Sequence, residues 1–81
     1  METIKETLKQ RGTVHGDFSD NALTSQMLKA VIRERTLTEL TPVMREALDM
    51  ICHKIARILS GDPTHADHWQ DISGYATLVE E

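Results

Sequence analysis

Residues 42–60, PVMREALDMICHKIARILS, form the most clearly defined helical segment of the chain. Pro42 suits a first helical position, Thr41 before it can cap the helix, and Gly61 supplies a C-terminal stop. At about 100° per residue, apolar and polar side chains separate onto opposite sides of the helical wheel. The apolar side comprises Met44, Leu48, Ile51, Ile55, Ile58 and Leu59, and the polar stripe comprises Glu46, Asp49, His53 and Arg57. This pattern predicts an amphipathic helix with a core-facing side.

Three further helices are expected, and each has an apolar face that would be buried. The first covers residues 2–10 and ends before Gly12, and residues 12–20 are rich in turn-forming residues, which indicates an ordered loop. The second covers residues 20–35, and its buried side would comprise Leu23, Met27, Ala30 and Val31. The last begins with Asp62 as cap and Pro63 in its first turn, continues to Val79 or Glu80, and would bury Trp69, Ile72, Ala76 and Val79.

The helical segments define the expected fold class. The chain has no two runs of alternating apolar and polar residues that could pair as strands, so the sequence predicts an all-α protein. The expected architecture is a compact bundle of about four helices, in one domain spanning residues 1–81. A chain of 81 residues is short. A domain of this size buries only about 60–65% of the surface that its unfolded chain exposes. We therefore expect helices from a second copy to complete the bundle, with a homodimer favoured.

Charge and cysteine content narrow the function classes. Thirteen acidic and nine basic residues give a formal charge of −4, which argues against a nucleic-acid-binding surface. Cys52 is the only cysteine, so no disulfide can form within the chain, and a buried packing role is favoured over a reactive one. No segment resembles a signal peptide or reaches membrane-spanning length. The expectation is a soluble, cytoplasmic protein without membrane or nucleic-acid partners.

Two acidic pairs mark the candidate site. Glu46 and Asp49 are three residues apart, and Asp67 and Asp71 are four apart, so each pair presents two carboxylates from one face of a helix. Carboxylate oxygens are ligands that Mg²⁺ prefers. If the two faces meet, the four acids would bind Mg²⁺ or Mn²⁺.

Two other interpretations of these residues stay open. The acids could simply lie on solvent-exposed helix faces and pair with side chains one turn away, as Asp49 could with His53. Against this interpretation, Gly74 in the last helix indicates close approach of another backbone or a ligand. Glycine there costs about 1 kcal/mol relative to alanine. The histidines could instead ligate a transition metal, although none of their spacings follows the HExxH zinc pattern. They are His15, His53, His65 and His68.

The strings HADHWQDISGYATLV, MREALDMICHKIARILSGDP and RGTVHGDF closely resemble a family of small phage and prophage proteins of unassigned function. More distantly, the acids resemble the EExxE, spacer, ExxD pattern of the MazG-like all-α nucleotide pyrophosphohydrolases. Glu46 and Asp49 match the first acidic pair, with Arg45 in place of its leading acid. Asp71 matches the final aspartate of ExxD, while His68 stands three positions before it.

The resemblance implies a Mg²⁺-dependent hydrolase that cleaves a nucleoside triphosphate to the monophosphate and pyrophosphate. The implied metal ligands are Glu46, Asp49, Asp67 and Asp71, and either Glu46 or Asp67 would act as general base. The positively charged groups expected to meet the phosphates are Lys54, Arg57, Arg11 and His15. The alternative is a non-catalytic helical module of phage origin that binds another protein.

Overall fold

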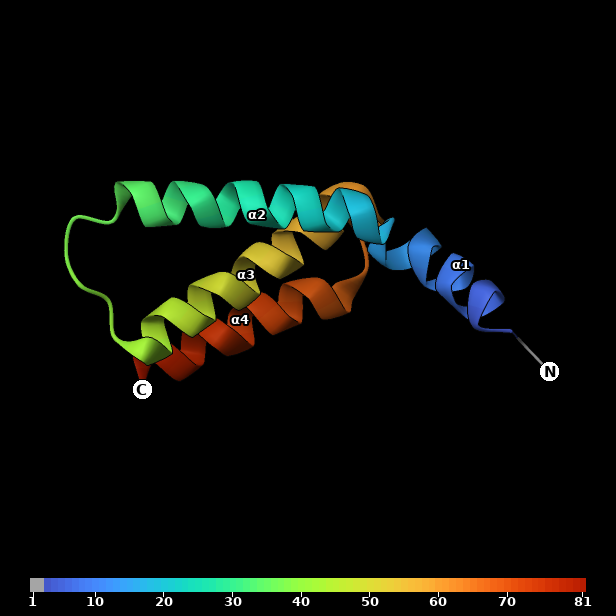
Figure 1. Cartoon of the computed structure of the whole chain (residues 1–81). Helices are drawn as coiled ribbons and strands as arrows, with labels where there is room; N and C mark the ends of the chain where they lie inside the picture. The colour runs from blue at the N-terminus through green and yellow to red at the C-terminus, as the bar shows by residue number, and fades with distance from the viewer. Residues whose placement is uncertain (1–2) are drawn as a thin grey trace.

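The computed structural model describes residues 3–81, which form four α-helices and, within that range, no strand (Figure 1). The helices are α1 (Ile4–His15), α2 (Phe18–Arg35), α3 (Pro42–Ser60) and α4 (Ala66–Glu80). The prediction of an all-α bundle of four helices is confirmed.

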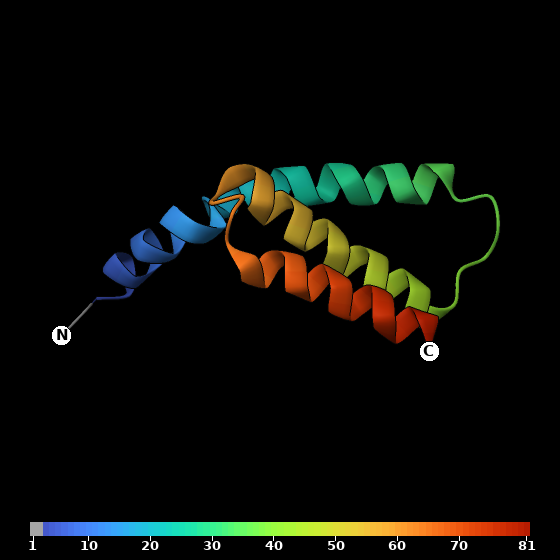
Figure 2. The same cartoon turned by 180° about the vertical axis from the view of Figure 1, so that it is seen from behind.

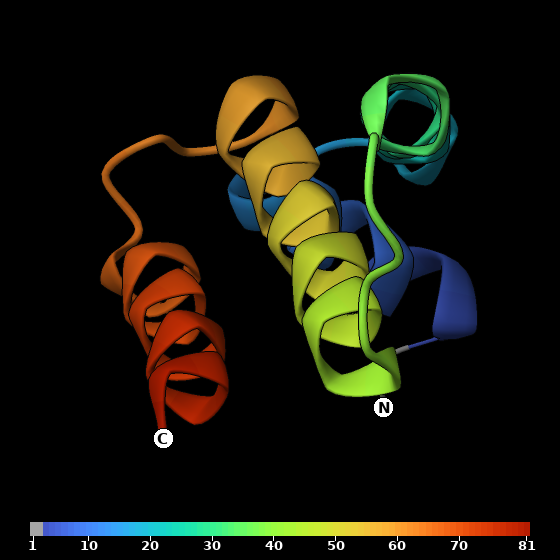
Figure 3. The ribbon, with the colours of Figure 1, turned by 90° about the vertical axis from the view of Figure 1, so that its left-hand side faces the viewer.

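Helix α3 lies at the centre of the molecule. Helix α2 packs along one flank of α3 and α4 along the other, and the end-on view shows α3 between them (Figure 3). Helices α2 and α4 make at most marginal contact with each other. Helix α1 extends beyond the end of this layer, so the molecule measures 49 × 26 × 21 Å (Figure 2).

The ends of α3 agree with the sequence pattern, and the start of α4 does not. The Thr41 hydroxyl accepts a hydrogen bond from the Met44 amide (3.2 Å), and α3 begins at Pro42, as predicted. The Asp62 carboxylate, however, accepts bonds from the amide and hydroxyl of Thr64 (2.9 and 2.6 Å). Because this local turn uses Asp62, α4 begins only at Ala66.

Helix α1 is longer than predicted. A capping box between Thr3 and Glu6 starts it, and it continues through Gly12 to His15. A Cβ at Gly12 would meet nothing within 4 Å, so this glycine marks neither a tight turn nor a close contact. The predicted loop over residues 12–20 is therefore wrong, because the break between α1 and α2 comprises only Gly16, at φ 83°, and Asp17.

The apolar core is small and lies on the flanks of α3. Its buried apolar residues, among those described, are Ala47, Cys52, Ala56 and Ile58. Burial of Cys52 agrees with the predicted packing role and raises the pKa of its thiol. The predicted core face of α3 is only partly covered, and Leu59 is 70% exposed. The reason is that α2 and α4 pack on either side of that face rather than on it.

The predicted buried faces of α2 and α4 are also wrong in part. Leu23, Met27 and Val31 are exposed, at 64%, 61% and 57%, because α2 turns its Ser25 side towards α3. Trp69 is 54% exposed, and its indole N–H donates to the Pro63 carbonyl (2.8 Å). The apolar spacing therefore predicted correctly that both segments are helices. It did not predict which side of each helix packs against α3.

The two short connections of the chain cross in direct backbone contact. A Cβ on Gly61 would collide with the Val14 carbonyl oxygen, and a Cβ on Gly16 would lie 2.5 Å from the Ser60 Cβ. The Asp62 amide donates to the same Val14 carbonyl (2.8 Å). This glycine crossing fixes the end of α1 against the end of α3.

We expect Gly61→Ala to lower the melting temperature strongly, since the added methyl group collides with backbone that cannot rotate away. Gly74→Ala is the matched control. A Cβ at Gly74 meets nothing within 4 Å, which corrects the predicted close approach there, so alanine should stabilise α4 by about 0.5–1 kcal/mol. Thermal unfolding of both variants, followed by circular dichroism, tests the crossing. Equal melting temperatures for the two variants would contradict it.

Candidate functional site

Polar side chains gather where the end of α1, the C-terminal half of α3 and the start of α4 meet, a region that we call the junction. Electrostatic coupling links the pKa of His15 to Arg11, Lys54 and Arg57, and that of Asp71 to Lys54 and Arg57. The junction therefore brings together five of the predicted site residues. They are Arg11, His15, Lys54, Arg57 and Asp71.

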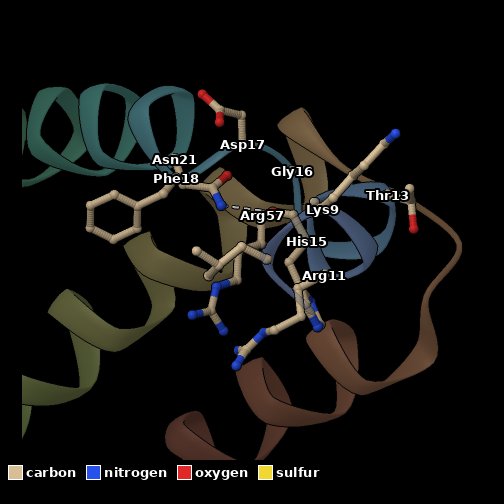
Figure 4. Close-up of a pocket in the computed structure, with 11 residues that line it drawn as sticks. Lys9, Arg11, Thr13, His15, Gly16, Asp17, Phe18, Asn21 and Arg57 are labelled. Carbon is tan, nitrogen blue, oxygen red and sulfur yellow. Dashed lines mark hydrogen bonds between the residues drawn. The ribbon is translucent and has the colours of Figure 1, made fainter. Parts of the chain in front are cut away.

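A hollow of about 710 Å³ opens on the α1 side of the junction. Arg11, His15 and Arg57 line it and point towards one side, whereas Lys9 and Asp17 point away (Figure 4). Neither Arg11 nor Arg57 forms an ion pair within residues 3–81. The hollow thus carries uncompensated positive charge, although the chain as a whole is acidic.

Lys54 and Asp71 form an ion pair beside the hollow. The Lys54 Nζ lies 2.8 Å from the Asp71 Oδ2, and the Lys54 side chain is only 12% exposed. Hydrogen bonding to Lys54 lowers the pKa of Asp71 below its usual value. A predicted phosphate-binding residue and a predicted metal ligand therefore neutralise each other in this chain.

The other predicted acids lie apart. Glu46 is exposed near the start of α3, beside an apolar depression that Tyr75 and Leu78 help to line. Asp67 is exposed at the start of α4, about 12 Å from Tyr75 along the helix axis. Asp49 lies on α3, close enough to Cys52 to raise the pKa of its thiol. Within the part of the chain that the structure describes, the four predicted carboxylates form no group able to share one ion.

Three of the four histidines do come together. Potential ligand atoms of His15, His65 and His68 all lie within 4.8 Å of one another, and their ring centroids are 5.0–5.6 Å apart. The His15 Nδ1 and His68 Nε2 are 3.1 Å apart. We call this group the histidine trio. His53 lies on α3 outside it.

Burial distinguishes His68 within the trio. It is 1% exposed, the most completely buried large side chain among the described residues, and its Nδ1 has no hydrogen-bond partner there. Burial, followed by the neighbouring positive charges, lowers the pKa of His68 and of His15. From the sequence, all four histidines were possible transition-metal ligands, but no local pattern indicated that His15 would meet His65 and His68 while His53 would not.

The fold and site define an all-α helical protein with a positively charged hollow and an adjoining histidine trio. No helix among residues 3–81 has the length and apolar character needed to cross a membrane. The DUF6378 family, a domain of unknown function, matches residues 1–81, and the chain belongs to this family. Neither the curated proteins nor the solved structures contain a match to the chain.

Asp71→Asn should lower the melting temperature. The substitution leaves the largely buried Lys54 ammonium without its carboxylate. Asp67→Asn, at an exposed position on the same helix, is the control. Because the pKa of Asp71 is lowered in the folded state, its contribution is present above the usual value of 3.8 and is lost as pH falls through the folded value. Melting curves of both variants at pH 7 that coincide would contradict the role of the pair.

Proposed function

We propose that the protein binds a nucleoside triphosphate in the junction hollow and, as a homodimer with Mg²⁺, cleaves it to the monophosphate and pyrophosphate. One observation carries this proposal: Arg11, His15 and Arg57 together line one wall of the hollow. The two arginines are 46 residues apart in the chain. All three residues are among those expected from the sequence to meet the phosphates.

The chemistry of the hollow suits a phosphorylated ligand. Guanidinium groups bind phosphate oxygens through paired, charge-assisted hydrogen bonds, and neither arginine is engaged by a carboxylate of the described chain. Phe18 lines the same hollow and is 80% exposed. Its ring offers a flat apolar surface on which a nucleobase can stack. The volume also falls within the range of small-molecule sites.

A second copy is part of the proposal because the carboxylates of one chain do not meet. For a mass of 9.2 kDa, a compact monomer exposes about 4,900 Å². This chain exposes 6243 Å². The excess is roughly 1,300 Å², which exceeds the roughly 800 Å² that each partner buries in a standard interface. Exposed apolar side chains on α2, such as Leu23 and Met27, supply a suitable surface.

In the proposed reaction, Arg11 and Arg57 hold the phosphates and stabilise the charge that develops on them. Glu46 or Asp67, facing the bound nucleotide across the dimer, accepts the proton of the attacking water. Bound Mg²⁺ supplies further charge neutralisation and lowers the pKa of a coordinated water. The proposed ligands for it come from Glu46, Asp49, Asp67 and Asp71, and the general base is whichever of Glu46 and Asp67 does not coordinate the ion.

The experiment is a screen of nucleoside triphosphates with Mg²⁺ and Mn²⁺, in which binding and pyrophosphate release are measured separately. Arg11→Gln and Arg57→Gln should each weaken binding at least about tenfold, because a charge-assisted bond contributes about 1.5–3 kcal/mol. Arg33→Gln, in the exposed last turn of α2, should leave affinity unchanged. Absence of binding at millimolar nucleotide, or an equal loss in all three variants, would reject the proposal.

The exposed apolar surface also favours a second candidate, a non-catalytic helical module that binds another protein. The same screen separates the two functions. Pyrophosphate release that requires Mg²⁺ or Mn²⁺ identifies the hydrolase. A chain that binds no nucleotide and buries its apolar surface against a different protein identifies the interaction module.

The assembly is tested by light scattering at micromolar concentration, which should give twice the chain mass of 9.2 kDa. The double substitution Leu23→Glu with Met27→Glu should shift the protein towards monomer, because it places charge on the exposed face of α2. Glu34→Gln, an exposed polar position on the same helix, is the control and should remain dimeric. A stable monomer for the parent chain would overturn the dimer.

A further inference from the structure

We propose that His15, His65 and His68 bind a transition-metal ion of the Zn²⁺ type, and that this ion fastens α1 to α4. The site is separate from the proposed Mg²⁺ centre, because its donors are imidazole nitrogens. Imidazole suits Zn²⁺ and its neighbours in the transition series, whereas Mg²⁺ prefers oxygen ligands.

The distances within the trio are close to those of a metal centre. With Zn–N bonds of about 2.05 Å, two ligand nitrogens of a tetrahedral site lie about 3.3 Å apart. The His15 Nδ1 and His68 Nε2 are 3.1 Å apart. Since all three potential ligand atoms lie within 4.8 Å of one another, a small adjustment of the partly exposed His65 side chain completes the set.

The burial of His68 fixes the position of one of the three proposed ligands. A neutral imidazole has one donor and one acceptor nitrogen, and leaving a buried polar group without a partner costs about 1–3 kcal/mol. His68 is 1% exposed, and its Nδ1 has no partner among residues 3–81. A metal bound at the Nε2 of His68 would replace its contact with the His15 Nδ1 and would leave Nδ1 as the protonated nitrogen of the ring.

The surrounding charges permit a cation despite the nearby arginines. The Asp67 Oδ2 lies 3.5 Å from the His65 Nε2. Asp62 and Asp71 also lie within electrostatic range of His68. The three carboxylates add negative charge around the trio, and solvent can supply the fourth ligand of a tetrahedral ion.

The proposed role follows from how few contacts α1 makes with the other helices beyond the glycine crossing at its end. No described residue of α1 is buried, and the helix makes few contacts with α3. His15 is its last residue, whereas His65 directly precedes α4 and His68 lies in the first turn of α4. A shared ion therefore joins two helices that are distant in sequence, and its binding free energy adds to the stability of the folded state.

The test is a Zn²⁺ titration of the full chain, prepared without a histidine tag and freed of metal by a chelator. We expect one Zn²⁺ per chain, a higher melting temperature, and slower hydrogen exchange in α1. Co²⁺ should give the visible absorption of a tetrahedral site. Mg²⁺ should neither bind the trio nor slow hydrogen exchange in α1, so these two measurements are independent of nucleotide binding and hydrolysis.

Substitutions locate the ligands. His15→Ala and His65→Ala, at partly exposed positions that are less critical for folding than His68, should each weaken Zn²⁺ binding at least tenfold, since even outer-shell changes cost about 10–100-fold. His53→Ala is the matched control, because His53 lies outside the trio. Binding weaker than millimolar, or an affinity unchanged in His15→Ala and His65→Ala, would overturn the proposal. A loss as large in His53→Ala would do the same.

Discussion

The close crossing of Gly16 and Gly61 is the constraint on which the rest of the molecule depends. Side chains at these positions would collide with Ser60 and Val14, so the two connections can touch only as glycines. The crossing directs the end of α1 towards α3 and the start of α4. The hollow lies at this point (Figure 4), and the histidine trio adjoins it through His15. A site of polar groups from three helices is therefore built around a contact between two backbones.

The sequence predicted the fold well where local rules decide it. The capping threonine and Pro42 fix the start of α3, because both act within one helical turn. The choice of packing face was predicted poorly. The continuous apolar side of α3 suggested one covered face, whereas α2 and α4 lie on its two flanks and leave Leu59 exposed. Helical periodicity identifies an apolar face but not the partner that covers it.

The candidate site was likewise predicted only in part, because spacing within one helix does not determine contacts between helices. Arg11, His15 and Arg57 were predicted to act together, and the structure brings them to one hollow. Spacing within one helix could not reveal that Asp71 pairs with Lys54, because that pair joins two helices. Nor could it show that the antiparallel alignment of α3 and α4 separates Glu46 from Asp67. Such facts depend on register between helices, which local patterns do not encode.

The central position of α3 has a consequence for the order of folding. The α2–α3 and α3–α4 pairs are hairpins of successive helices, so most of their contacts join nearby parts of the chain and can form rapidly. The contact of His15 with His68 spans 53 residues and closes a much longer loop. We therefore expect the layer of three helices to form first. The junction would then assemble late, after its three helices already exist.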